Sequence, residues 1–153
     1  METTELMRED WILLAGIKIF CQVDAIGQNS VSGVTASGGS FEQSISRFEP
    51  IQLNRDILLR TSFWLVSGTN SFRKVVRGIA GFEYNIDRRR LEVFVEGEER
   101  PNIHCGVESL HQLQHLYKHY TKGSKLEVNI LHNKRKDYNQ RTRNKQVQNE
   151  QAK

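Results

Sequence analysis

The sequence has little cysteine and no long hydrophobic run. Its two cysteines, Cys21 and Cys105, lie far apart in a chain of 153 residues and match no metal-binding or redox spacing. We interpret both as reduced side chains that behave as small hydrophobes. No apolar run approaches the ~20 residues that cross a bilayer, and residues 1–5 lack the basic and apolar segments of a signal peptide. These absences predict a soluble cytoplasmic protein that has no membrane partner.

Motifs for catalysis and cofactor binding are also lacking. The glycine-rich stretch at 36–40 has neither the lysine nor the helix-opening hydroxyl of a phosphate-binding loop. There is no nucleophile elbow, and His104 beside Cys105 is no catalytic dyad, because neighbouring residues of a strand point to opposite faces. The sequence therefore predicts a protein that is not an enzyme and carries no cofactor.

The positive charge is confined to the C-terminal end of the chain. The net charge is +4, but residues 132–153 carry +5 and residues 1–131 carry −1. The basic residues that could contact nucleic acid through this tail are Lys134, Arg135, Lys136, Arg141, Arg143 and Lys145. The tail has almost no apolar residues with which to form a core, so we expect it to be disordered or a solvated helix.

The N-terminal part reads as a small β unit. Three short segments rich in β-forming residues, 10–14, 19–23 and 30–34, are separated by glycine-containing turns. Close spacing of this kind is typical of a small barrel or a curled meander. We therefore predict an SH3-like β unit over residues 8–35.

A short helix and an antiparallel sheet follow. Asn54 is a favourable N-cap for the helix, whose buried side extends as far as Leu65. A strand is predicted at 72–79. Apolar and polar residues then alternate along 82–86 and 91–95, which is the pattern of a half-buried hairpin.

The last part predicts a further strand at 103–107, an amphipathic helix and a final strand. Ser109 and Gln112 have the spacing of a capping box, and Gly123 stands where a helix-ending glycine belongs. Residues 126–130 alternate as a strand would. The whole pattern predicts the α+β class, with residues 1–131 forming one compact domain.

Three histidines lie at four-residue steps on the predicted C-terminal helix: His111, His115 and His119. Such spacing aligns side chains that could bind a transition metal. The stripe falls opposite the leucine and tyrosine side of the helix, includes no carboxylate, and has Lys118 and Lys122 beside it. We therefore expect a solvated face rather than a metal site, and little effect from replacing the histidines with glutamine.

Six basic residues lie near the predicted hairpin: Arg73, Lys74, Arg77, Arg88, Arg89 and Arg90. If the strands that carry them are neighbours, they form one basic rim on an otherwise neutral body. Guanidinium groups suit phosphate or carboxylate groups, so the rim is our first choice for a partner site. The second choice is a pocket between the N-terminal β unit and the C-terminal helix.

Two segments carry a resemblance to a known family. The stretch FEPIQLNRDILL at 48–59 and the stretch HQLQHLY at 111–117 resemble the "PIPLTEEILL" and "HQLQNLYFALTGEEL" segments of uncharacterised phage and prophage proteins of Bacteroidota. The similarity covers most of residues 5–128. The chain departs from the pattern at Lys118, His119 and Lys122, and in its basic tail. The resemblance implies a phage protein in the cytoplasm of a bacterial host and no particular activity.

Three functional hypotheses from different classes follow. The first is a non-enzymatic phage accessory protein that counters host defence by binding a host protein or by sequestering a small anionic ligand. The second is a nucleic-acid-binding factor that uses the tail and the arginine rim. The third is a minor structural protein of the virion. Whether the chain forms a homo-oligomer is left open at this stage.

Overall fold

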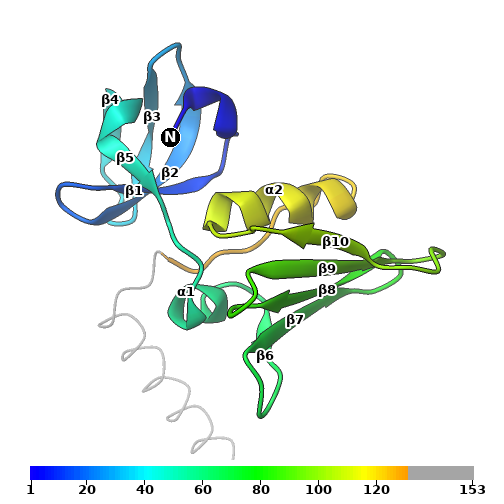
Figure 1. Cartoon of the computed structure of the whole chain (residues 1–153). Coiled ribbons are helices and arrows are strands. Elements are labelled where there is room, and N and C mark those ends of the chain that lie inside the picture. Colours follow the sequence, from blue (N-terminus) through cyan, green and yellow to red (C-terminus); the bar gives the residue numbers. More distant parts are fainter. Residues whose placement is uncertain (131–153) are drawn as a thin grey trace, which may run out of the picture.

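The computed structural model describes residues 1–130 and is mostly β. It contains two five-stranded antiparallel sheets, with strand orders β4-β3-β2-β1-β5 and β10-β9-β8-β7-β6. Figure 1 shows the two sheets on either side of a single long helix, α2. The predicted α+β class is therefore correct only in that helices and antiparallel sheets are both present.

The first sheet contains the three predicted N-terminal strands and two more. Its elements are η1 (Thr3–Glu5), β1 (Trp11–Leu14), β2 (Ile19–Ile26), β3 (Ser30–Thr35), β4 (Ser40–Ser44), η2 (Ile45–Arg47) and β5 (Phe48–Pro50). The β unit thus extends to Pro50 instead of ending at residue 35. Strand β5 returns to pair with β1, where Leu14 lies opposite Phe48. Six buried side chains form the hydrophobic core of this sheet: Leu6, Ile12, Cys21, Val23, Val31 and Phe48.

The predicted short helix is present but ends earlier than expected. Helix α1 spans Arg55–Leu59, and Asn54 caps it by accepting a hydrogen bond from the Ile57 N–H at 2.8 Å. The Thr61 hydroxyl donates to the Leu58 carbonyl at 2.6 Å. This bond satisfies a carbonyl of the last turn, and the chain then leaves the helix direction. Leu65, which we expected on the helix, lies instead in strand β6 (Trp64–Leu65).

The second sheet contains the predicted hairpin. Its strands after β6 are β7 (Ser71–Val76), β8 (Ala80–Asn85), β9 (Arg90–Val95) and β10 (Asn102–Cys105). Phe82 and Tyr84 of β8 and Leu91 and Val93 of β9 are all buried on one face, so the period-two prediction is confirmed. The Tyr84 hydroxyl donates to the Val107 carbonyl at 2.6 Å, which satisfies this group inside the core.

Helix α2 (Leu110–Tyr120) covers the core face of the second sheet. The capping box is confirmed, because the Ser109 hydroxyl accepts from the Gln112 N–H and the Gln112 side chain accepts from the Ser109 N–H. Leu110, Leu113 and Tyr117 are buried against the sheet. Gly123 follows the helix with a φ of 98°, a conformation that glycine adopts readily.

The predicted last strand is wrong. Residues 126–130 form a single bridge, Thr61 with Val128, and no ladder. Leu126 and Ile130 are nevertheless buried in the core of the second sheet. The alternation of apolar and polar residues along 126–130 reflects burial of every second side chain. An extended segment can bury its side chains in this way without pairing with another strand.

No helix within residues 1–130 is long and apolar enough to cross a membrane.

Candidate functional site

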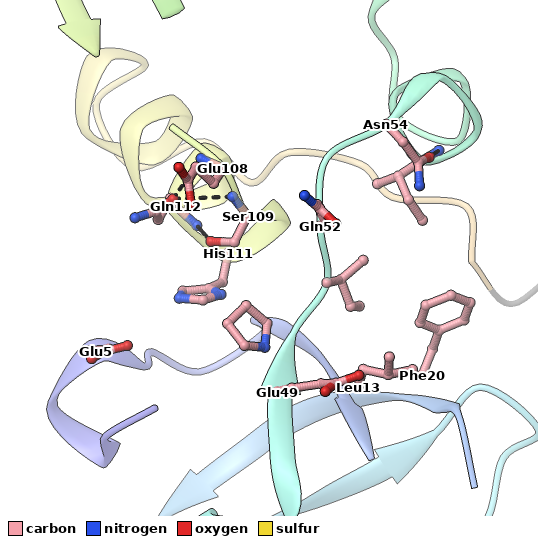
Figure 2. Close-up of a pocket in the computed structure, with 13 residues that line it drawn as sticks. Glu5, Leu13, Phe20, Glu49, Gln52, Asn54, Glu108, Ser109, His111 and Gln112 are labelled. Carbon is pink, nitrogen blue, oxygen red and sulfur yellow. Dashed lines mark hydrogen bonds between the residues drawn. The ribbon is translucent and has the colours of Figure 1, made fainter. Parts of the chain in front are cut away.

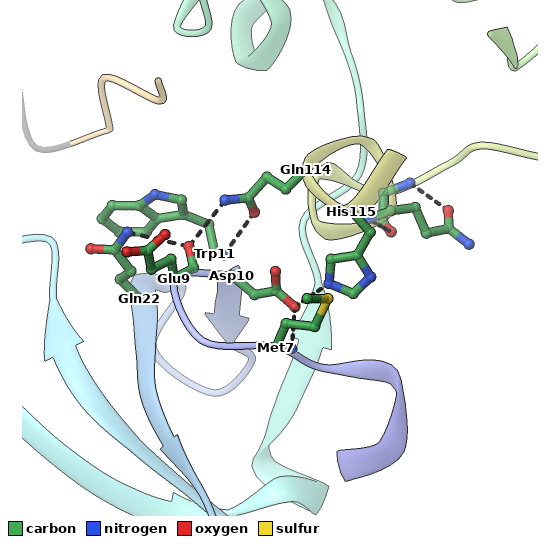
Figure 3. A network of polar contacts seen from close by, with 9 residues as sticks. Met7, Glu9, Asp10, Trp11, Gln22, Gln114 and His115 are labelled. Atoms are coloured by element: carbon green, nitrogen blue, oxygen red, sulfur yellow. Dashed lines mark hydrogen bonds and ion pairs between the residues drawn. The ribbon is translucent and has the colours of Figure 1, made fainter. Parts of the chain in front are cut away.

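The polar side of α2 contacts the first sheet. Gln114 and His115 are neighbours on this side of the helix and lie opposite the residues just before and within β1 (Figure 3). The His115 Nε2 lies 2.6 Å from Asp10 Oδ2, and the Gln114 Oε1 accepts from the Trp11 N–H at 3.0 Å. The helix is therefore held between the two sheets, with apolar residues on one side and polar residues on the other.

The turn before β1 is shaped for this contact. Glu9 has a φ of 75°, in the left-handed region that non-glycine residues seldom occupy. Its carbonyl accepts from the Gln114 Nε2 at 3.0 Å and from the Gln22 Nε2 at 3.2 Å. Asp10, next in the chain, is buried and also accepts from the Met7 N–H at 2.7 Å. The unusual backbone conformation thus occurs where the carbonyl of Glu9 binds both sheet and helix.

The expectation of a solvated histidine stripe is wrong for two of its three members. The His111 side chain is buried, and His115 is paired with the buried Asp10, which supplies the carboxylate that the helix itself lacks. His119 is exposed, and its ring packs edge-on against Tyr120. Within residues 1–130 no group of three His, Cys, Asp or Glu side chains is placed to hold a metal ion.

A cleft of about 590 Å³ opens beside His111, between the first sheet, the segment after β5 and the N-terminal end of α2 (Figure 2). Hydrogen bonds from the Leu53 N–H to the Glu108 carbonyl and from the Leu110 N–H to the Ile51 carbonyl join two of its walls. Its apolar wall consists of Leu13, Phe20, Pro50, Ile51 and Ile57. Its polar wall consists of Glu5, Glu49, Gln52, Asn54, Glu108, Ser109, His111 and Gln112.

His111 is the unusual side chain in this cleft. It is 4% exposed, and its Nδ1 has no hydrogen-bond partner among the residues that the structure describes. Burial lowers the pKa of His111; Asp10 and Glu5 oppose this shift and His115 adds to it. A neutral imidazole is therefore favoured. A buried nitrogen without a partner is rare in proteins, and here it belongs to a residue that lines a cleft large enough for a ligand.

The charge of the cleft is acidic. Glu5, Glu49 and Glu108 contribute carboxylates, whereas no lysine or arginine among residues 1–130 lines the wall. Lys18 pairs with Glu49 at 3.0 Å and Arg89 pairs with Glu108 at 2.8 Å, both on exposed surface where solvent weakens the attraction. The cleft consequently favours a neutral or positively charged guest over an anion.

The predicted arginine rim is not assembled. Arg88, Arg89 and Arg90 lie at the turn between β8 and β9, whereas Arg77 follows β7 at the opposite end of the sheet. Lys74 pairs in register with Phe82 and so belongs to the core face, while Arg73 belongs to the other face. The condition that these six residues be neighbours is not met.

Ion pairs further divide this group. Arg73 binds Glu83, Arg89 binds Glu108 and Arg90 binds Glu92. Of the three arginines at the turn, Arg88 alone forms no ion pair with a described residue. The six tail residues from Lys134 to Lys145 lie outside the described part of the chain, so the nucleic-acid prediction for them stays a prediction.

Sequence reasoning named the cleft only as a second choice and named few of its residues. Glu5, Glu49 and Gln52 carry no local signal, because each is a single polar residue in a polar segment. Two sequence features pointed to the cleft, the histidine spacing and the capping box, because both mark the N-terminal end of α2, which forms one wall of the cleft. Their meaning depended on the first sheet, which lies about a hundred residues earlier in the chain.

Two polar side chains of the cleft wall are already engaged in hydrogen bonds within the chain. The Ser109 hydroxyl, which could act as a nucleophile in another setting, serves as the cap of α2, and the Gln112 Oε1 is occupied by the Glu108 and Ser109 N–H groups. His111 remains as the group able to form a new hydrogen bond from a buried position. No protein-family model, no curated protein and no solved structure matches this chain.

Proposed function

We propose that this protein is a non-enzymatic binding protein that holds a small molecule in the cleft between the first sheet and α2. The observation that carries the proposal is the buried His111, whose side chain lines the cleft and whose Nδ1 has no hydrogen-bond partner among the described residues. A ligand that supplies a partner to this nitrogen removes the penalty of leaving it unsatisfied, which is about 1–3 kcal/mol for a buried polar group.

The ligand that fits best is neutral or cationic, with an apolar body and at least one hydrogen-bonding group. The apolar wall, which includes Phe20 and Pro50, receives the body. The three glutamates disfavour an anion, so sequestration of an anionic ligand, the expectation from the sequence, is the less supported form of the hypothesis. A host protein would fit the same cleft by inserting a neutral or cationic side chain that has an apolar body.

The phage setting is proposed from the resemblance of residues 48–59 and 111–117. Both segments contribute to the cleft: Glu49 to Ile57 from the first, and His111 and Gln112 from the second. A shared site is one reason why two distant segments would carry a common pattern. We therefore propose an accessory role in the host cytoplasm in which the cleft is the working surface.

We also keep an SH3-like barrel as a proposal for the first sheet. Four strands follow one another in a meander, a 3-10 turn (η2) follows β4, and β5 then returns to β1. This connectivity is the arrangement expected of SH3-like barrels. In such a barrel the cleft would lie where the last strand leaves for α1.

The test is a ligand-observed NMR screen with small aromatic fragments that bear an amine, a hydroxyl or a carboxylate. We expect amine and hydroxyl fragments to bind the wild type but not the Gln52→Trp variant, because the new indole fills the cleft from an exposed wall position. The matched control is Gln28→Trp, an exposed glutamine in the β2–β3 turn, which should bind as the wild type does. Fragment binding that is equal in both variants would place the site elsewhere, and a preference for carboxylates would contradict the charge argument.

A second function is favoured by the charge of the tail. Residues 132–153 carry +5 on a chain whose remainder is nearly neutral, which suits contact with nucleic-acid phosphates. If the tail binds nucleic acid, the affinity should fall steeply with salt, and neutralising Lys134, Arg135 and Lys136 should reduce that salt dependence. Measurement of the affinity for a generic duplex at two salt concentrations separates this function from binding in the cleft, which should depend little on salt.

A further inference from the structure

The face of the second sheet that points away from α2 carries an unusual number of exposed apolar side chains. Trp64, Val75, Phe94 and Ile103 are 47%, 57%, 47% and 51% exposed, and they come from β6, β7, β9 and β10. In Figure 1 the helix α2 covers only the opposite face of this sheet. We call the outward side the open face. Large apolar side chains that are exposed together on one face of a sheet can mark an interaction site.

Strand register orders the open face into rows that cross the sheet. One row runs through all five strands and reads Trp64, Arg73, Glu83, Glu92 and Ile103. The next row reads Val75, Gly81 and Phe94 on β7, β8 and β9. In both rows the middle position belongs to β8, the central strand.

We propose that the open face binds the open face of a second copy of this chain, with a twofold axis parallel to β8 between the two sheets. Sheets that pack face to face lie about 10 Å apart with their strands nearly aligned. Such an axis keeps each row opposite itself and exchanges its two ends. Each β6 then lies over the partner's β10, and each β7 over the partner's β9.

The exchange pairs unlike charges and buries all four apolar side chains. Arg73 comes to lie opposite the second copy's Glu92, and Glu92 opposite its Arg73. Within its own chain Arg73 also binds Glu83 and Glu92 also binds Arg90, so the contact across the axis adds to these two ion pairs. Trp64 likewise meets Ile103, and Val75 meets Phe94. A row whose charge order is positive, negative, negative is complementary to its own reverse at its two outer charges, and a self-complementary patch is what a twofold interface requires.

The central position is compatible with this arrangement. Glu83 meets its own copy on the axis, but each Glu83 already accepts a hydrogen bond from Arg73 at 2.8 Å within its own chain. In the second row the axis passes through Gly81, which has no side chain to obstruct the contact between Val75 and Phe94. The two strands beside β8 therefore carry the contacts that decide affinity.

Analytical ultracentrifugation of the full chain from about 1 to about 200 µM tests the proposal, a range in which micromolar association is visible. We expect a reversible dimer in the wild type. Phe94→Glu should weaken it at least about tenfold, because a charge then faces the apolar Val75 of the second copy. The matched control is Val34→Glu, which places the same charge at an exposed strand position of the first sheet, and should dimerise as the wild type does.

A pair of charge reversals identifies the proposed axis. Arg73→Glu should weaken the dimer at least about tenfold because two carboxylates would then face each other across the interface, and Glu92→Arg should do so because two guanidinium groups would. A mixture of the two variants should form a heterodimer. Positions 73 and 92 then face each other with opposite charges at both contacts across the interface, and the repulsion within each separate variant is absent. Circular dichroism checks that each variant is folded, and the mixture itself excludes misfolding as the cause, because an unfolded chain would not recover on mixing.

Three results would overturn the proposal. One is a wild type that stays monomeric at the highest concentration. Another is a dimer that Phe94→Glu leaves intact. The last is a dimer in which the mixed charge variants fail to associate while each is folded, which would exclude the twofold arrangement described here.

Discussion

The core of the second sheet and the core of the first sheet differ in size and in what covers them. Eighteen buried side chains gather around the second sheet, compared with six inside the first. The larger core is covered by α1, α2 and the segment 126–130. Within residues 1–130 the smaller one is covered by η1, η2, the turn before β1 and its own curled strands. The stability of the first sheet should therefore depend more on contacts with the rest of the chain.

Those contacts come from α2. Trp11, although it belongs to β1, is buried within the larger core, and its N–H binds Gln114. His115 and Asp10 form a second link, and the Glu9 carbonyl a third. A helix with one apolar and one polar buried face can thus join a large core to a small one. The cleft lies beside this junction, where the helix and the sheet part.

The largest effect should come from damage to the larger core. Phe82 is buried among Phe63 and Tyr117, with ring centroids 6.2 and 5.0 Å away. Phe82→Ala should lower the free energy of unfolding by about 3–5 kcal/mol, because it removes a large apolar side chain and leaves a cavity. Phe41→Ala, in the half-buried margin of the smaller core, should have a clearly smaller effect in urea denaturation. Equal effects would contradict the difference between the cores.

Damage confined to the first sheet should be next in size. Gly33 of β3 lies so close to β2 that a Cβ would stand 2.0 Å from the Gln22 carbonyl oxygen. Gly33→Ala should therefore destabilise by about 1–3 kcal/mol, as overpacking usually does. Hydrogen exchange should show faster opening of β2 and β3 but little change in β8 and β9. Gly68→Ala, in an open turn of the second sheet, serves as a control without a steric clash, although its φ of 77° adds some strain.

Cutting the link between the sheets should have an intermediate effect. Gln114→Leu leaves the buried Trp11 N–H without its partner, and a lost partner of this kind costs about 1–3 kcal/mol, of which the added apolar area recovers part. Protection of β1 amides against exchange should fall, while the core of the second sheet keeps its protection. Lys118→Leu, at an exposed position of the same helix, is the control. Unchanged protection of β1 in Gln114→Leu would mean that the first sheet does not depend on α2.

The smallest effect concerns pH. The pKa of His111 is lowered in the folded protein, first by burial and then by His115, against the opposing influence of Asp10 and Glu5. Below the ordinary histidine value near 6.5 the unfolded chain thus binds more protons than the folded one, so the free energy of unfolding falls as pH drops through this window and is regained above it. The contribution cannot exceed about 1.4 kcal/mol per pH unit for one proton.

Denaturation of wild type and His111→Gln at pH 5 and pH 7.5 measures this contribution. The difference in stability between the two pH values should be smaller in the variant, because other groups titrate equally in both proteins. A variant with the same or a larger pH dependence would show that His111 is not the group responsible.

Much of the local structure was predictable because it depends on neighbours in the sequence. The capping box of Ser109 and Gln112, the N-cap Asn54 and the β8–β9 hairpin are each encoded within a few residues, and all three are confirmed. Strand β4 was missed because its residues, Ser40–Ser44, are polar and only Phe41 contributes to a core. The same difficulty applied to the final segment, where alternation was mistaken for strand pairing.

The sequence by itself determined where the two α-helices begin, where the β8–β9 hairpin lies, which residues are apolar, and that the positive charge is concentrated in the tail. Only the tertiary structure decided that the polar side of α2 is an interface, because Asp10 and His115 are separated by 105 positions in the chain. It also decided which basic residues are neighbours and formed the cleft from segments that are distant in sequence. The physical reason is that capping and alternation act between residues a few positions apart, whereas burial of a polar side chain depends on which other part of the chain packs against it.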